Sequence, residues 1–404
     1  MSLKQLILTN RAQGSEGEDT TALRVLLLGI FVSAAGASLA SIGFSLLAAQ
    51  SGQSSLLAAV LAANLVPTVL FGLVGGHISD RYMAWWWWPA SLVLAAVITL
   101  LMAITLDWVV IIAGCALISS CAALVGPVAH KLVAHYSANS ARTGSQLAVV
   151  QGAAGVLGVA AGGMSFGAGA LRTMLVIDAI AMLLLALVGV MLARQGALAR
   201  DERPHKIQLT QGLRLLSSPR AFGNLGLLLI ITTVTSTSLD DVSGIFALTR
   251  DLGLSPTQYG FASASWAVGI VAGSWLGSRI TEKPLVYYPL VALPIGLAIG
   301  AVGLLQPGFT TIMVLFAAGG VGNGAFNALT NRVILSSVPE HQQGRVWAGF
   351  RWIVYVCLLS GYALGAALGS QYALHLMAYG GSALVLSALA NVLGRVVLAR
   401  GGCE

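Results

Sequence analysis

The sequence predicts an all-α membrane protein with twelve transmembrane helices, arranged as two similar six-helix bundles. Three observations predict this fold class. Only 9% of the 404 residues are charged and 57% are hydrophobic, whereas soluble domains carry about 25% charged residues. Apolar segments of about 20 residues, the length that spans a bilayer, recur along the whole chain. The longest polar stretch lies near the middle and separates these segments into six and six.

The predicted spans follow one another with short polar connections. The first six cover 22–49, 55–78, 86–105, 108–129, 144–166 and 172–193. The second six cover 222–248, 257–279, 285–305, 309–331, 346–369 and 374–396. We therefore divide the chain into an amino-terminal bundle (1–193), a cytoplasmic connecting loop (194–220) and a carboxy-terminal bundle (221–404). Residues 1–20 are polar, unlike a cleavable signal peptide, so we expect the first span to be retained.

The distribution of basic residues predicts the orientation of the spans. With the amino terminus in the cytoplasm, 18 of the 21 Lys and Arg residues lie in cytoplasmic segments. The exceptions are Arg172 and Arg250, which lie outside, and Arg351, which lies within a span. Basic residues collect on the cytoplasmic side of membrane proteins. We therefore expect both termini in the cytoplasm of a bacterial-type inner membrane, and we attribute the net charge of +7 to this rule rather than to a nucleic-acid partner.

The two halves share features at a constant offset. A shift of 203 residues (345 − 142 = 203) places Arg142 on Arg345, and it also aligns glycines of the fifth and eleventh spans. Gly158 then falls on Gly361. Repeats related by an axis along the membrane normal are known in transporters, whose binding sites lie at the midplane between the repeats. The offset therefore predicts two pseudo-symmetric bundles.

The second span ends in glycines followed by an acidic–basic pair. Gly76, Asp80 and Arg81 resemble the signature loop of the major facilitator superfamily, although 83–85 lack the glycine and basic residues found there. The resemblance implies a loop that latches the two halves. Asp80 would then reach the amino end of the eleventh helix near Arg345, where the helix dipole favours an anion.

The fifth span contains a glycine motif. Gly158, Gly162 and Gly163 resemble the antiporter motif of the same superfamily, with Val159 in place of its proline. Such glycines let neighbouring helices pack closely. Together with the segments 322–327 and 338–346, the motif is similar to the drug-efflux branch that includes macrolide exporters and the enterobactin exporter.

The resemblance to this branch implies a secondary active transporter that works by alternating access. We expect proton-coupled export of a small amphipathic organic compound, either a drug-like molecule or a siderophore. The expected partners are this small-molecule substrate, protons and the lipid bilayer, and we expect a monomer. Lipid or lysolipid flipping and a transporter-like sensor are the alternatives.

Ionisable residues within spans are costly and therefore suggest function. Asp178 lies near the outer end of the sixth span, and Asp240 and Asp241 lie in the outer third of the seventh. A carboxyl group that changes its exposure to water can take up and release a proton, so we predict that these acids include the proton-coupling residue. Neighbouring helix residues point about 100° apart, so Asp240 and Asp241 cannot both face the central cavity, which the resemblance places beside the seventh helix. The alternatives are an outer-surface pair near the loop at Arg250 and Asp251 and, for Asp178, a structural role near Arg172.

Polar residues of the tenth and eleventh spans are the substrate-binding candidates. Asn323, Asn327 and Asn331 recur every four residues and so share one helix face. We predict that Asn323 and Asn327 contact the substrate. Arg351 could meet an anionic group of the substrate or pair with an acid such as Asp80 as a gate.

Signatures of other functional classes are missing from the sequence. We find no Walker A loop, no nucleophilic serine elbow and no His-Glu-x-x-His metal motif. The four cysteines lack metal-ligand spacing. We therefore expect no enzymatic activity, no cofactor and no metal.

Overall fold

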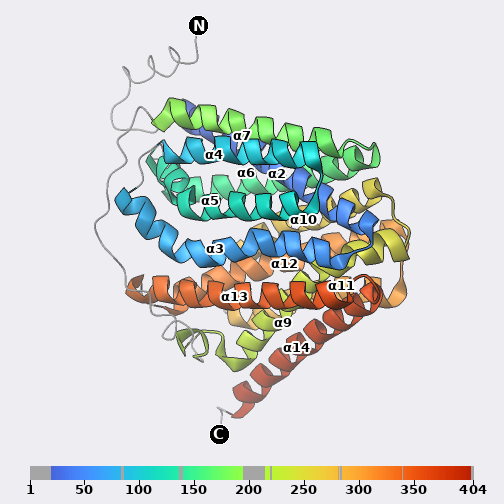
Figure 1. Cartoon of the computed structure of the whole chain (residues 1–404). Coiled ribbons are helices and arrows are strands. Elements are labelled where there is room, and N and C mark those ends of the chain that lie inside the picture. Colours follow the sequence, from blue (N-terminus) through green and yellow to red (C-terminus); the bar gives the residue numbers. More distant parts are fainter. Residues whose placement is uncertain are drawn as a thin grey trace. The chain divides into compact units, whose positions relative to one another are not determined.

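The computed structural model describes residues 20–82, 86–135, 140–193, 214–218, 221–280, 282, 284–338 and 340–401. Within these residues the chain is helical and contains no strand (Figure 1). The first half contributes six long helices, which are α2 (Thr20–Ser51), α3 (Ser54–Tyr82), α4 (Trp87–Thr105), α5 (Trp108–His135), α6 (Ser140–Gly167) and α7 (Leu171–Ala193). Each of the first six predicted spans overlaps one of these helices, in the same order.

The second half repeats this series. Its helices are α9 (Gly223–Phe246), the π-helix η1 (Ala247–Asp251), α10 (Pro256–Arg279), α11 (Pro284–Leu305), α12 (Phe309–Ser337), α13 (Glu340–Leu368) and α14 (Ala373–Gly401). The predicted spans again match one helix each, except that the seventh runs from α9 into η1. Some helices, such as α3 and α12, are longer than the predicted apolar spans. They extend past the apolar segment into the more polar residues that follow it.

Eleven helices of the described residues are long and apolar enough to cross a membrane. The remaining long helix, α10, does not reach this apolarity because its sequence is interrupted by Gln258 and several serines. Its glycines nevertheless pack it tightly on α12. A methyl group added at Gly277 would lie 2.8 Å from the Cα of Ala325. Small residues thus hold α10 in the second half, although it is less apolar than the other predicted spans.

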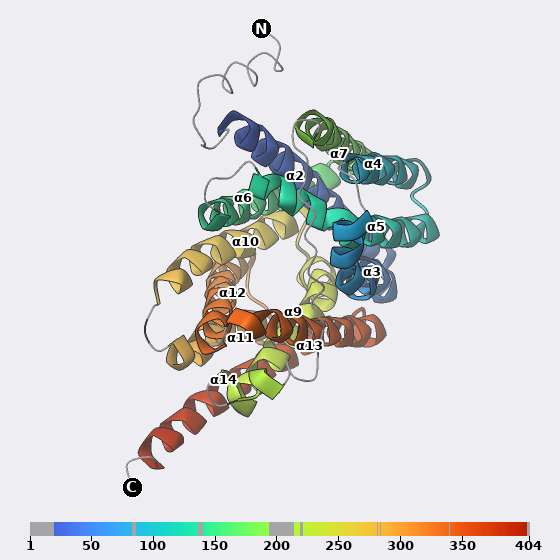
Figure 2. The same ribbon diagram turned by 90° about the vertical axis from the view of Figure 1, so that its left-hand side faces the viewer.

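The chain divides into two compact units, 1–43 with 63–204 and 44–62 with 205–404. In the first unit, α4 and α7 lie side by side in both views (Figures 1 and 2). Trp88 at the start of α4 packs with Leu26 of α2 and Leu185 of α7. In the second unit, Ser54 at the start of α3 donates a hydrogen bond to the carbonyl oxygen of Ala366 in α13 at 3.0 Å.

One helix contact recurs in both units at the predicted offset. In the first unit, Gly158 of α6 lies so close to α2 that an added methyl group would clash with Ala35 and Ser38. In the second unit, Gly361 of α13 lies even closer to Ser238 of α9. Both members of the contact are shifted by 203 residues (361 − 158 and 238 − 35). The internal repeat is therefore present in the packing as well as in the sequence.

Large apolar side chains lie on the outer surfaces of both units. Ile104, Val109 and Leu304 are among the most exposed apolar residues of the described chain. A soluble monomer rarely exposes contiguous apolar surface on this scale. The outward-facing leucines and isoleucines are those expected of helices that face lipid.

Candidate functional site

The acidic pair of α9 occupies two different environments within the second unit. Asp240 is partly buried, and its Oδ1 atom is fully covered and has no hydrogen-bond partner among the described residues. This oxygen lies 2.6 Å from the position that a Cβ atom at Gly244 would occupy, one turn further along the helix. Asp241 is exposed. The two carboxyl groups therefore diverge, as their adjacent positions on a helix require.

Two tyrosines of neighbouring helices lie within electrostatic range of the acids. Tyr259 of α10 is close to both Asp240 and Asp241, and Tyr362 of α13 is close to Asp241. Tyrosine hydroxyl groups can donate and accept hydrogen bonds. Neither tyrosine was predicted from the sequence, because single polar residues in otherwise apolar spans give no spacing signal. The position of Tyr362 directly after Gly361, where α13 approaches α9, is the clue that could have identified it.

Several hydroxyl groups of α9 donate hydrogen bonds to backbone carbonyl oxygens of the same helix. Thr233 donates to the carbonyl oxygen of Leu229 at 2.6 Å, and Ser243 donates to that of Leu239 at 2.8 Å. Ser236 instead crosses to α14 and donates to the carbonyl oxygen of Gly380 at 2.8 Å. Bonds of the first kind can bend a helix locally, whereas the bond of Ser236 anchors α9 to α14. They leave the carboxyl groups as the chemically distinctive groups of α9.

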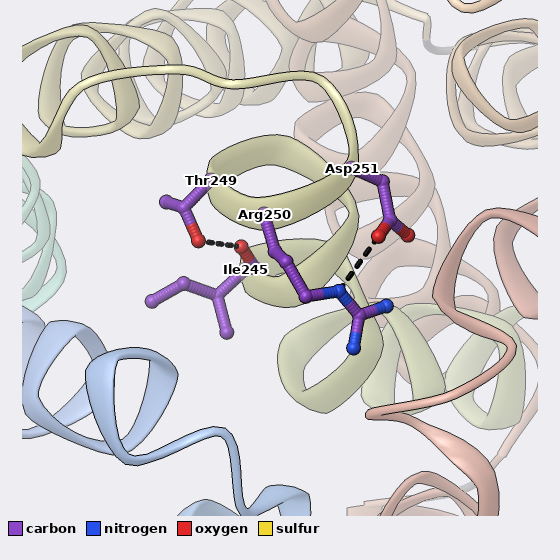
Figure 3. Close-up of polar contacts among 4 residues, drawn as sticks. All are labelled: Ile245, Thr249, Arg250 and Asp251. Atoms are coloured by element: carbon purple, nitrogen blue, oxygen red, sulfur yellow. Dashed lines mark hydrogen bonds and ion pairs between the residues drawn. The ribbon is translucent and has the colours of Figure 1, made fainter.

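The carboxyl end of α9 continues as the π-helix η1. Figure 3 shows Thr249 donating to the carbonyl oxygen of Ile245, at 2.6 Å, and Arg250 Nε paired with Asp251 Oδ1, at 2.7 Å. In the described residues, Arg250 is paired with its neighbour Asp251. The alternative that Asp240 and Asp241 form an outer-surface pair near the loop at Arg250 and Asp251 stays a prediction.

Asp178 is the buried acid of the first unit. It is 3% exposed, and its Oδ1 has no hydrogen-bond partner among the described residues. The oxygen lies against α2, 2.8 Å from where a Cβ atom at Gly36 would stand. The part of the chain that the structure describes contains no ion pair between Asp178 and Arg172, so the structural partnership considered from the sequence is not formed there.

An apolar groove of about 360 Å³ runs along α2, α6 and α7 in the same unit. Its lining includes Phe31, Leu157 and Ile180, together with Gly36, against which Asp178 packs. All of its lining residues are apolar or glycine. The groove therefore suits a hydrocarbon group.

The amide pair of α12, Asn323 and Asn327, lies on one helix face, as its spacing predicted. Asn327 donates from Nδ2 to Asn323 Oδ1 at 3.3 Å, and Asn327 is exposed. Arg351 of α13 is also exposed, and the described residues offer it no carboxylate partner. No described hydrogen bond links these groups to Asp240. Their role in substrate binding stays a prediction.

The glycine motif of α6 lies at a helix contact. Gly158 and Gly162 pack directly on α2, where the carbonyl oxygen of Leu39 would lie 3.2 Å from a methyl group added at Gly162. Gly163 follows on the same buried stretch. The motif therefore brings the backbones of α6 and α2 together.

The signature-loop group of Gly76, Asp80, Arg81 and Arg345 belongs to α3 and α13. The side chains of these four residues lie outside the described part of the structure. The predicted latch therefore stays a prediction.

Comparison with known proteins decides the family. Residues 26–240, more than half of the chain, match the family described as Major Facilitator Superfamily. The chain belongs to this superfamily. Membership confirms the predicted fold class, and the chain is a multi-pass membrane protein.

Proteins similar to this chain include the multidrug efflux pump Tap of Mycobacterium tuberculosis and of Mycobacterium bovis. Each is 28% identical over 251 residues, which cover 58% of this chain and 59% of the relative. The chain thus matches less than two thirds of the length of these relatives.

Solved structures of other transporters share the fold. A bacterial homologue of the human lysosomal transporter Spinster, inward-facing and unoccupied, superposes with a TM-score of 0.68 at 14% identity, covering 94% of this chain and 99% of the other. A peptide transporter POT gives 0.71 at 12% identity, with 99% of each chain covered. The nucleoside transporter NupG gives 0.68 at 14% identity, covering 92% and 98%.

Proposed function

We propose that this chain is a secondary active transporter that exports small amphipathic organic compounds and is driven by protons taken up on Asp240. The observation that carries the coupling proposal is the covered Oδ1 of Asp240, which has no hydrogen-bond partner among the described residues. Burying an ionised carboxylate without a partner is costly. Binding a proton removes that cost.

A coupling carboxyl must also be able to release its proton. Tyr259 lies within electrostatic range of Asp240, and the exposed Asp241 is its direct neighbour. A change in helix packing that opens this cluster to water would favour the ionised form of Asp240. Asp178, which is buried and also carries an unpartnered oxygen among the described residues of the first unit, is the second candidate for a proton-binding site.

Export as the direction of transport is supported by the relatives. Tap is named as a multidrug efflux pump, and it is 28% identical to the aligned part of this chain. The closely packed Gly158, Gly162 and Gly163 correspond to the antiporter-like motif, which adds to this inference.

The amphipathic nature of the substrate is supported by the groove between α2, α6 and α7. Its apolar lining would accept the hydrocarbon part of a compound that partitions into the bilayer. It offers no polar side chain for a lipid headgroup. The groove therefore supports a cargo with a hydrocarbon part.

Transport into energised inverted membrane vesicles tests the proposal. We expect the wild-type chain to accumulate members of a panel of fluorescent amphipathic dyes, and a protonophore to abolish this uptake. Asp240→Asn should lower gradient-driven uptake at least about tenfold, equivalent to about 1.4 kcal/mol, while downhill dye exchange continues. Asp251→Asn, at the exposed ion pair with Arg250, is the matched control and should keep normal uptake.

The same assay ranks the three acids. Asp241→Asn and Asp178→Asn are measured beside Asp240→Asn. Uptake that survives the protonophore would refute proton coupling. If Asp240→Asn behaves like the wild type and Asp178→Asn does not, the coupling site lies in the first unit instead.

A further inference from the structure

Two helices, α2 and α3, pass from one compact unit into the other. The first unit contains residues 1–43 and 63–204, and the second contains 44–62 and 205–404. The end of α2, the start of α3 and the turn between them therefore belong to the second unit. We call this segment, Phe44–Ala62, the outer hairpin, because the charge distribution predicts that its turn lies outside the cell.

Hydrogen bonds at the turn hold the outer hairpin together. Only Gly52 and Gln53 separate α2 from α3. Gly52 has a φ of 70°, a left-handed conformation that glycine adopts without steric cost. Its N–H donates to the carbonyl oxygen of Ala49 at 3.1 Å, and the Ser51 hydroxyl donates to that of Ala48 at 2.7 Å. With so short and well-bonded a turn, the outer hairpin can move as one piece.

One face of α3 attaches the outer hairpin to α13. Ser54, Leu57 and Ala58 share this helix face and are 3%, 1% and 5% exposed. The Ser54 hydroxyl donates to the carbonyl oxygen of Ala366 at 3.0 Å. Just past the end of α13, a methyl group added at Gly369 would lie 3.3 Å from the Cβ of Ser54. The hydrogen bond and this close approach hold the start of α3 within the second unit.

A different bond attaches α3 to the first unit, about 15 Å further along the helix. The Ser119 hydroxyl of α5 donates to Asn64 Oδ1 at 3.1 Å. Pro67 follows inside the helix, and because it has no N–H it cannot donate to the carbonyl oxygen of Ala63. Ala63 is the residue with which α3 enters the first unit. The helix therefore lacks a regular hydrogen bond where it passes from one unit to the other.

The other helix of the hairpin leaves the first unit at a glycine. Gly29, Gly36 and Gly43 recur every seven residues along α2, and a methyl group added at any of them would contact α7. At Gly43 that methyl group would lie 2.8 Å from Leu171 Cδ1, and the outer hairpin begins at the next residue, Phe44. Glycine inside a helix makes it less stable than alanine would. Both helices are thus locally weakened at the boundary.

We propose that the outer hairpin is an outer gate, which Ser54 holds on the second unit and which moves by bending α2 at Gly43 and α3 at Pro67 when this bond is released. The proposal rests on the export function proposed above, because an exporter must open its outer end to release its cargo. Hinges for such motions consist of a few positions that absorb the change in backbone angles. Ser54 acts as a positioning residue for the gate.

Thiol labelling tests the role of Ser54 independently of transport. In a chain whose four native cysteines are replaced, Leu57→Cys should react slowly with a membrane-impermeant maleimide added outside the cell. Adding Ser54→Ala removes the bond to Ala366 and should speed this reaction at least about fivefold, because the gate opens more often. Ser265→Ala is the matched control, since it removes a similar bond from α10 to the carbonyl oxygen of Met313, at 3.1 Å. It should leave the labelling rate unchanged.

Replacing the hinge proline tests the motion itself. Pro67→Ala restores a helical N–H and stiffens α3, so it should slow both gradient-driven dye uptake and downhill dye exchange at least about fivefold. Its unfolding midpoint in detergent should stay the same or rise. Pro294→Ala is the matched control, because Pro294 also lies inside a helix, but α11 stays within the second unit. It should keep both rates.

The gate and the proton coupling fail in different ways. Asp240→Asn should stop only gradient-driven uptake, whereas a stiffened gate should also slow downhill exchange, and the labelling of Leu57→Cys needs no transport at all. An unchanged labelling rate after Ser54→Ala would overturn the gate proposal. Normal downhill exchange by Pro67→Ala, or equal slowing by Pro294→Ala, would also overturn it.

Discussion

At the scale of single residues, the environment of Asp240 depends on a glycine one turn further along α9. A methyl group at Gly244 would lie 2.6 Å from Asp240 Oδ1, well inside van der Waals contact. We predict that Gly244→Ala turns the carboxyl group away and lowers gradient-driven dye uptake about tenfold, or about 1.4 kcal/mol. Vesicle uptake under a fixed proton gradient measures the effect.

A double variant separates this effect from general damage to α9. If Gly244→Ala acts through the carboxyl group, combining it with Asp240→Asn should reduce uptake no further than Asp240→Asn alone. An additive loss in the double variant would show that Gly244 acts by another route. Far-ultraviolet circular dichroism checks that each variant keeps its helices.

The sequence predicted the acidic residues of the site better than their partners. Asp178 and Asp240 stand out because charges are rare in apolar spans, and each proves to have a covered oxygen that is unpartnered in the described residues. Tyr259 and Tyr362 are amphipathic and common in membrane helices, so nothing in their spacing marked them. The tyrosines come close to the acids only because α9, α10 and α13 pack together. No local pattern in the sequence indicates that packing.

At the scale of helices, the contact between α6 and α2 depends on the absence of a side chain. An added methyl group at Gly158 would clash with the backbone of Ala35 and lie 2.7 Å from the Cβ of Ser38. We predict that Gly158→Ala destabilises the chain by about 1–3 kcal/mol, as overpacking typically does. The midpoint of thermal unfolding in detergent measures this change.

The same helix provides the control for this prediction. A methyl group at Gly155, one turn away on α6, would meet no atom within 4 Å. Gly155→Ala makes the same change in helix propensity without the clash, so it should leave the unfolding midpoint unchanged or slightly raised. Equal destabilisation by both substitutions would contradict a role for close packing at Gly158.

Helix existence was predictable from apolarity, but helix ends and irregularities were not. Twelve apolar segments correspond to twelve long helices among the described residues, even though α10 falls short of the apolarity of a typical span. The π-helix at Ala247–Asp251 lies inside the region predicted as one regular span and its loop. Its wider turn depends on the backbone bonds around Leu252 and Leu254, and no residue pattern signals such a turn in advance.

At the scale of the whole molecule, the 203-residue offset is the most informative feature of the sequence. It aligned glycines of the fifth and eleventh spans, and the structure shows that their contact partners obey the same shift, from Ala35 to Ser238. A glycine at this contact lets the partner helix approach closely, with Ala35 as partner in one unit and Ser238 in the other. The division of the chain into two bundles by a loop at 194–220 stays a prediction, and so does a central cavity. The contacts described above all lie within one unit or the other.

The orientation of the whole chain gives a further prediction. The charge distribution places Gln53, between α2 and α3, outside the cell and Glu282, between α10 and α11, in the cytoplasm. Both residues are exposed, so a cysteine at either position should react with a membrane-impermeant maleimide. In a chain whose four native cysteines are replaced, intact cells should label Gln53→Cys strongly and Glu282→Cys weakly, because the reagent reaches only the outer face. Inverted vesicles should reverse this ratio. Labelling of both cysteines from the same side would mean that the number of membrane crossings between them is even rather than odd, and it would remove α10 or another helix from the set of spans.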